Sequence, residues 1–205
     1  MRAGLRAGLL GALGVALGAH TPYRQWKVYR RRHLLIVASK TDPEAYETGT
    51  ALAAALAEHL PASKARPSRA PSLERVASLI ATKQMNVAVL TRAQAAALMD
   101  GRAAFHKGAP VALRALFATA AHLLVCRADF PAAHAYLVVQ TLDRQRAALP
   151  LAGARAPDPA QSPVPVHEGA LAYLDGRPLP GAATLGREPD AGLEEDHPHL
   201  HAPKQ

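Results

Sequence analysis

The sequence has a single cysteine, few aromatic residues and none of the short motifs that mark common catalytic sites. Because Cys126 has no second cysteine to pair with, it forms no internal disulfide and says nothing about an oxidising compartment. The patterns G-x-S-x-G, Walker A, H-E-x-x-H and C-x-x-C are all missing from the sequence. No arrangement of residues assigns a nucleophile, a base and an orienting acid. We therefore expect a protein that is not an enzyme and that uses no cofactor.

Basic residues outnumber acidic ones, giving a net charge of +8, and part of this excess is local. The basic run comprises Arg24, Lys27, Arg30, Arg31 and Arg32. Such a run is typical of a contact with nucleic acid or anionic lipid, or of a solvated linker beside a membrane. No RNA-binding aromatic pattern and no DNA-reading helix accompanies it. We expect a linker, and no nucleic-acid partner.

The first 32 residues are expected to form a signal or anchor segment followed by this basic linker. Arg2 and Arg6 precede an apolar, glycine-rich run over residues 7–19. The run is short for a membrane span but suits the core of a signal peptide, and Ala16 and Gly18 would provide a cleavage site. The larger basic cluster after the run opposes export, because positive charge is retained in the cytoplasm. Cleavage and retention as an anchor both stay open.

Short apolar runs alternate with amphipathic segments over residues 33–149, as in β-α-β units. Strands are predicted at residues 33–39, 62–70, 86–90, 113–118 and 122–127, and helices at 43–59, from Ser72, at 93–99 and from Pro131. Pro67 restricts the second strand to a sheet edge. This pattern predicts an α/β domain with three layers and a mostly parallel sheet. Cys126 is expected to pack in the core; the alternative is a reactive thiol beside His122, four residues earlier on the same strand face.

From Pro150 onward the composition shifts to proline, alanine and glycine, and this predicts a largely disordered tail over residues 150–205. An island at residues 164–174, which reads V-P-V-H-E-G-A-L-A-Y-L, is expected to be ordered, with His167 capping or packing it. Near the C-terminus His197, His199 and His201 alternate with other residues. Their spacing matches no structural zinc pattern, so we expect no metal site.

Several segments, taken in order, resemble the TAXI-type solute-binding proteins of TRAP transporters. They are L-I-V-A-S-K-T-D-P-E-A-Y (35–46), R-A-P-S (69–72), M-N-V-A-V-L-T (85–91), L-R-A-L-F (113–117), H-L-L-V-C-R (122–127) and P-V-H-E-G-A-L-A-Y (165–173). The resemblance implies one lobe of a type II periplasmic-binding-protein fold, located in the periplasm or on the periplasmic face of the inner membrane. It also implies a small carboxylate solute as ligand, and a membrane transporter or another inner-membrane protein subunit as partner.

By this resemblance the ligand-binding side chains are those of Ser39, Thr41, Tyr46, Arg69, Ser72 and Thr91. For Ser72 an ordinary helix N-cap, and for Arg69 a solvated charge, are the alternative roles.

Two features depart from the family. The second lobe that would follow Arg127 is missing, and the two binding turns lack the glycines that let backbone N–H groups approach an anion. Asp42, in the first of these turns, would also repel a carboxylate. The sequence therefore predicts either a TAXI-like solute-binding protein or a structural or regulatory partner of a membrane complex with no small ligand.

Overall fold

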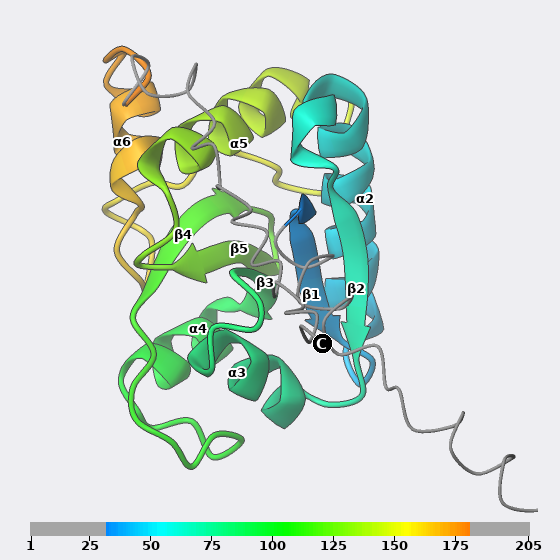
Figure 1. The fold of residues 1–205 in the computed structure, drawn as a ribbon, viewed down its shortest axis with the longest axis vertical. Helices are drawn as coiled ribbons and strands as arrows, with labels where there is room; N and C mark the ends of the chain where they lie inside the picture. Colours follow the sequence, from blue (N-terminus) through cyan, green and yellow to red (C-terminus); the bar gives the residue numbers. More distant parts are fainter. Residues whose placement is uncertain (1–31, 181–205) are drawn as a thin grey trace, which may run out of the picture.

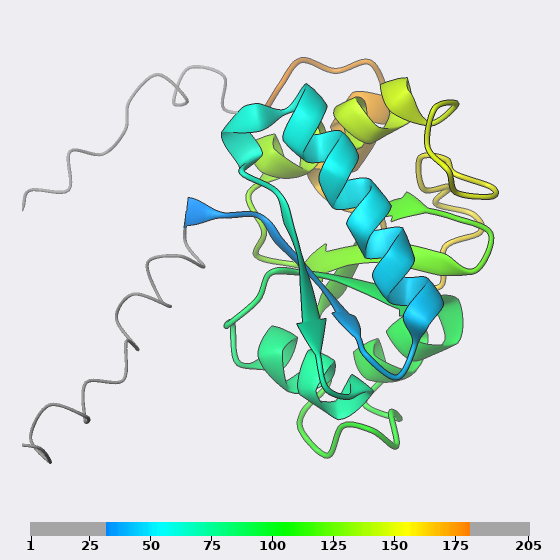
Figure 2. The same cartoon turned by 90° about the vertical axis from the view of Figure 1, so that its right-hand side faces the viewer.

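The computed structural model describes residues 32–180, which form a five-stranded sheet between two layers of helices (Figure 1). The elements are β1 (Leu35–Ser39), α2 (Pro43–His59), the 3-10 helix η1 (Pro61–Ser63), β2 (Arg66–Ala70), α3 (Leu73–Ala81), β3 (Val87–Thr91), α4 (Arg92–Met99), β4 (Leu113–Ala118), β5 (His122–Arg127), α5 (Ala132–Gln145) and α6 (Glu168–Leu174). Helices α2 and α5 cover one face of the sheet, with α6 packed on α5, and α3 and α4 cover the other face (Figures 1 and 2). The expected α/β class is confirmed.

The strands lie in the order β2-β1-β3-β5-β4. Strand β1 is parallel to β2 and β3, whereas β5 is antiparallel to both β3 and β4. The sheet is therefore mixed, and the expectation of a mostly parallel sheet is not fully supported. The physical reason is the short connection at residues 119–121, since parallel neighbours need a crossover of a dozen or more residues. The short spacing between the apolar segments that form β4 and β5 is itself typical of a β-hairpin.

Helix α2 begins where local signals in the sequence predicted it to begin. Asp42 caps α2, its Oδ1 accepting a hydrogen bond from the Ala45 N–H at 3.0 Å, and Pro43 occupies the first turn. Proline suits this position because the first-turn N–H groups have no partner within the helix. Strand β2, which contains Pro67, pairs only with β1 and lies at the sheet edge as predicted.

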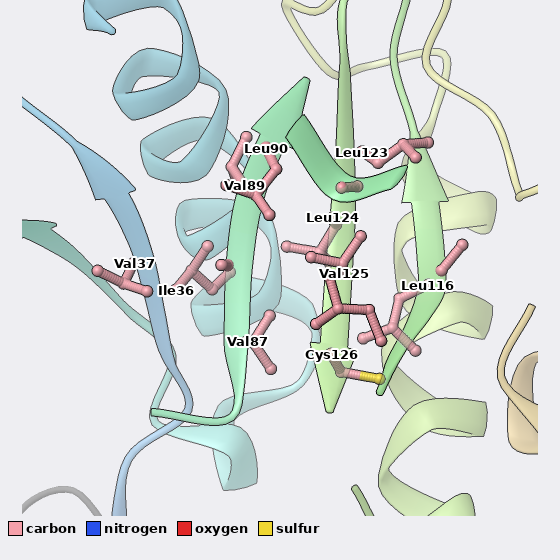
Figure 3. Close-up of a cluster of buried hydrophobic side chains, with 14 of the residues drawn as sticks. Ile36, Val37, Val87, Val89, Leu90, Leu116, Leu123, Leu124, Val125 and Cys126 are labelled. Atoms are coloured by element: carbon pink, nitrogen blue, oxygen red, sulfur yellow. The ribbon is translucent and has the colours of Figure 1, made fainter. Parts of the chain in front are cut away.

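The core lies on both faces of the sheet, because helices cover each face. Figure 3 shows Ile36 on β1, Val87 and Val89 on β3, and Val125 and Cys126 on β5, all of them fully buried. Strands β3 and β5 are buried along almost their whole length, which explains why they read as continuous apolar runs rather than as alternating patterns.

The chain after α5 runs along the outer edge of β4. Ala118 exchanges two backbone hydrogen bonds with Arg155, at 3.0 and 2.9 Å, and Ala115 bonds to Pro165 and His167 at 2.9 and 3.1 Å. We expected disorder after Pro150 outside the island, but residues 152–167 bond to β4 and the β4–β5 turn, and α6 then packs on α5. Composition predicted a loose tail, whereas the free backbone groups of an edge strand provide partners that hold it. The folded unit thus extends past residue 149.

Several sequence predictions fall on residues outside the described range 32–180. These are the signal or anchor segment, the basic residues 24–31 and the three histidines near the C-terminus. Within residues 32–180, no helix combines the length and the apolar character needed to cross a bilayer.

Candidate functional site

The carboxyl ends of β1, β2 and β3 lie at the same end of the sheet, which we call the carboxyl edge. All six side chains that were expected to bind a ligand lie on or beside this carboxyl edge. The three parallel strands have the order 2-1-3, with α2 leaving β1 toward one face and α4 leaving β3 toward the other. Open α/β sheets bind ligands outside the carboxyl ends of their strands at such a change of direction. The edge between Ser39 and Thr91 is therefore the first candidate site.

The hydroxyl groups of the β1–α2 turn bond to each other. Ser39 Oγ lies 2.7 Å from Thr41 Oγ1 and accepts a further hydrogen bond from the Thr41 N–H at 3.1 Å. The Ser39 side chain is buried, and the Lys40 N–H donates to the Ala70 carbonyl at the end of β2, 2.7 Å away. The turn is thus closed by internal hydrogen bonds.

Ser72 and Thr91 act as helix N-caps. The Ser72 hydroxyl accepts from the Arg75 N–H at 3.4 Å, and its hydrogen bond to Glu74 lowers the pKa of that carboxyl. Thr91 forms a capping box with Gln94: the Gln94 N–H donates to Thr91 Oγ1 at 3.2 Å, and the Thr91 N–H donates to Gln94 Oε1 at 3.0 Å. Of the two roles considered for Ser72, the structure shows the cap.

Tyr46 and Arg69 bind each other across the α2–β2 contact. The Arg69 guanidinium carbon lies 3.8 Å from the centroid of the Tyr46 ring, a cation–π geometry. The Arg69 side chain remains exposed on its other side. The Arg69 guanidinium therefore covers one face of the Tyr46 ring at the carboxyl edge.

His122 also lies at this edge, at the start of β5, although it was not among the six residues expected to bind a ligand. It faces Thr91 across the β3–β5 pairing, is 2% exposed, and its Nε2 lies 3.4 Å from Asp42 Oδ2. Its Nδ1 is buried and has no hydrogen-bond partner among residues 32–180.

Cys126 is fully buried, and burial raises the pKa of its thiol far above the ordinary range. Core packing is therefore the role of Cys126, because its thiolate, the reactive form, is strongly disfavoured.

The island at residues 164–174 contains α6, which packs against α5. His167 is 1% exposed; its Nδ1 accepts from the Gly169 N–H at 3.1 Å, and its Nε2–H donates to the Phe130 carbonyl 2.9 Å away. Burial lowers the pKa of His167. The Tyr173 hydroxyl donates to Asp143 Oδ2 at 3.0 Å. The expected capping role of His167 is confirmed, and the polar groups of this motif bond internally.

A pocket of about 340 Å³, which the sequence did not indicate, opens at the same edge on the α2 side of the sheet. Its walls are the first turns of α2, the β4–β5 turn and the chain just after α5. The lining residues are Glu44, Glu47, Thr48, Ala51, Thr119, Ala120, Ala121, Pro150, Leu151 and Ala152. The only sequence signal was the placement of two glutamates one helical turn apart, because the other walls come from distant parts of the chain.

Comparison of the chain with protein-family models, with curated proteins and with solved structures gave no match. Among residues 32–180 there is also no group of three or more His, Cys, Asp or Glu side chains arranged to hold a metal ion. The functional argument therefore rests on the geometry of the carboxyl edge and of the pocket.

Proposed function

We propose that this chain is a TAXI-like single lobe, of the type II periplasmic-binding-protein architecture, that serves as a partner of an inner-membrane protein in TRAP-type transport and captures no small carboxylate. One observation carries the proposal: the six side chains expected to bind a carboxylate are engaged within the protein. Two hydroxyls bond to each other, two cap helices, and the tyrosine stacks under the arginine. A ligand would have to displace these contacts.

The charges at this edge also disfavour an anion. Helix N-termini attract negative groups. Here, however, Asp42 is the N-cap of α2, Glu44 lies in its first turn, and Glu74 lies in the first turn of α3. These carboxylates compensate the helix dipoles internally and would repel a second carboxylate.

The single lobe also supports the proposal that the chain captures no small carboxylate. Small-ligand sites bury most of the ligand surface, and a two-lobed receptor does this by closing around it. The described residues form one sheet, whose β4 edge is covered by the chain's own residues 155–167. A carboxylate at Ser39 and Ser72 would stay half exposed unless another protein covered it.

Isothermal titration of the full chain with glutamate and related acids tests the missing carboxylate site. We expect no heat above that of dilution. Saturable heat that disappears in the Arg69→Gln variant, but persists in Arg66→Gln on the same strand, would restore the receptor and contradict the proposal.

Co-purification from membranes in mild detergent tests the partnership. We expect a stoichiometric inner-membrane protein to stay with the tagged full chain. Recovery of the chain alone, as a soluble periplasmic protein, would contradict the proposed role.

A further inference from the structure

We propose that the end of the sheet at which β1, β2 and β3 begin, which we call the amino edge, lies against the anionic headgroups of a phospholipid bilayer. This inference goes beyond the proposed function and does not depend on it. The amino edge is opposite the carboxyl edge and includes residues 32–34, 64–66 and 82–86, which lead into the three strands. Figure 2 shows the starts of β1 and β2 on the same side of the molecule.

Positive charge is in excess at the amino edge and balanced at the carboxyl edge. The last strand residues, the turns and the helix starts of the carboxyl edge contain four basic and four acidic residues: Lys40, Arg69, Arg75 and Arg92, and Asp42, Glu44, Glu47 and Glu74. The amino edge contains five basic and two acidic residues: Arg32, Lys64, Arg66, Lys83 and Arg127, and Glu58 and Asp129. Helices α2 and α3 end there, but the partial negative charge of roughly one half at each C-terminus does not outweigh this excess.

The basic side chains of the amino edge are exposed and have few acidic partners. Lys64 and Arg66 are exposed and form no ion pair within residues 32–180. Asp129 accepts hydrogen bonds from Arg127 Nε and Nη2, each at 2.8 Å, and Lys83 Nζ lies 3.3 Å from the same carboxylate, with its side chain 71% exposed. Since this one carboxylate is shared by two cations, positive charge remains available to an anionic surface outside the domain.

The backbone at Lys64 and Lys83 is a second, independent observation. Both lysines have left-handed backbone, with φ 47° and 59°, and they are the only residues other than glycine with positive φ within residues 32–180. The other positions with positive φ are occupied by Gly101, Gly153 and Gly176. Glycine adopts this conformation without strain, whereas a residue with a Cβ does not. A strained residue where glycine would fit points to a function, and here both strained residues bring the same charge to the same edge.

The sequence that joins the domain at the amino edge favours lipid as the anionic partner. Residue 32 leads directly into β1, and it ends the basic run 24–32, which follows the apolar run 7–19. A basic cluster beside an apolar segment is typical of a contact with anionic headgroups. Nucleic acid fits less well, because the exposed residues of the amino edge within the described range include no Phe, Tyr or Trp on which a base could stack.

Co-sedimentation of the full chain with phospholipid vesicles tests the proposal. We expect binding to vesicles of equal parts phosphatidylcholine and phosphatidylglycerol, weaker binding as salt is added, and none to phosphatidylcholine alone. The double variant Lys64→Gly, Lys83→Gly should bind roughly tenfold or more weakly, because each basic residue near an anionic surface contributes about fivefold. The matched control Lys40→Gln, Arg75→Gln removes two charges from the carboxyl edge and should bind within roughly twofold of the wild type.

Two further measurements separate the charge of the lysines from a role in folding. Lys64→Arg, Lys83→Arg keeps the charge and should bind like the wild type. The melting temperature of the glycine double variant should not fall, because relief of backbone strain offsets the greater freedom of the unfolded chain; a clear fall would assign the lysines to the fold and contradict the proposal.

The proposal is overturned if phosphatidylcholine alone binds the chain equally well, if the glycine double variant binds like the wild type, or if the carboxyl-edge control weakens binding as much. It is also overturned if random-sequence duplex DNA or single-stranded RNA binds the chain more tightly than the anionic vesicles do at the same salt concentration.

Discussion

At Gly169 the backbone of α6 comes so close to α5 that no side chain fits between the two helices. A Cβ at this position would overlap the carbonyl oxygen of Ala132. Gly49, in the middle of α2, is different, because a Cβ there would meet Val89 and Ile36 at 3.4 and 3.5 Å, the limit of ordinary contact. The first glycine is thus required by packing, and the second is not.

Substitution of these two glycines by alanine should therefore have opposite consequences. We expect Gly169→Ala to lower the free energy of unfolding by about 1–3 kcal/mol, because α6 must move away from α5. Gly49→Ala should leave it unchanged or raise it by up to about 1 kcal/mol, since alanine favours helix. Urea unfolding followed by circular dichroism measures both. Equal destabilisation by the two variants would contradict the requirement for glycine at position 169.

At the level of elements, α6 depends on its contacts with α5 rather than on its own helix propensity. Helices of this length are not stable alone in water. Its N-terminus is capped by the neutral imidazole of His167, and Tyr173 packs edge-on against Tyr136 with ring centroids 5.6 Å apart. Protonation of His167 at Nδ1 would remove the acceptor for the Gly169 N–H, which links the docking of α6 to pH.

The stability of the protein should accordingly fall in acid through His167. Burial lowers the pKa of His167 from its ordinary value of 6.5, so the unfolded chain binds a proton more readily than the folded one. The contribution is complete above pH 6.5 and is lost as the pH falls from there through the folded-state value. We expect the melting temperature to fall less between neutral pH and pH ~5.5 in His167→Asn than in the wild type. Asparagine can still cap α6 but does not titrate.

Overall, His167→Asn should be less stable by about 1–3 kcal/mol at neutral pH, because it leaves the Phe130 carbonyl without its donor. An unchanged pH slope in His167→Asn would assign the acid sensitivity to other groups.

At the scale of the whole molecule, access to Cys126 reports on opening of the sheet. Strand β5 lies between β3 and β4, with helices on both faces, and burial raises the pKa of the thiol. Neither a solvent path nor a thiolate is available in the native state. Reaction of Cys126 therefore requires a large opening of the protein.

We expect the native protein to show almost no reaction with a disulfide reagent at neutral pH, and a rate that rises with denaturant in parallel with unfolding. Glu58→Cys, which adds an exposed thiol on α2, should react at once with one equivalent while Cys126 stays protected. Fast reaction of Cys126 in the wild type without denaturant would mean that β5 is accessible in the native state.

Elements whose signals are local could be predicted from the sequence alone. Asp42 with Pro43 marked the start of α2, Ser72 the start of α3, and continuous apolar runs marked β3 and β5, because caps, proline geometry and burial on two faces depend on neighbouring residues. The six residues of the carboxyl edge were named through the resemblance to TAXI-type proteins, because the segments that carry the resemblance follow the predicted strands.

The contacts that these residues make depend on the tertiary structure. Hydrogen bonds between Ser39 and Thr41, the stacking of Arg69 on Tyr46 and the contact of His122 with Asp42 join groups from different elements, and periodicity contains no information about such distances. The same holds for the attachment of residues 150–167 to β4. The pocket beside Thr48 likewise exists only because three segments far apart in the chain meet at one edge of the sheet.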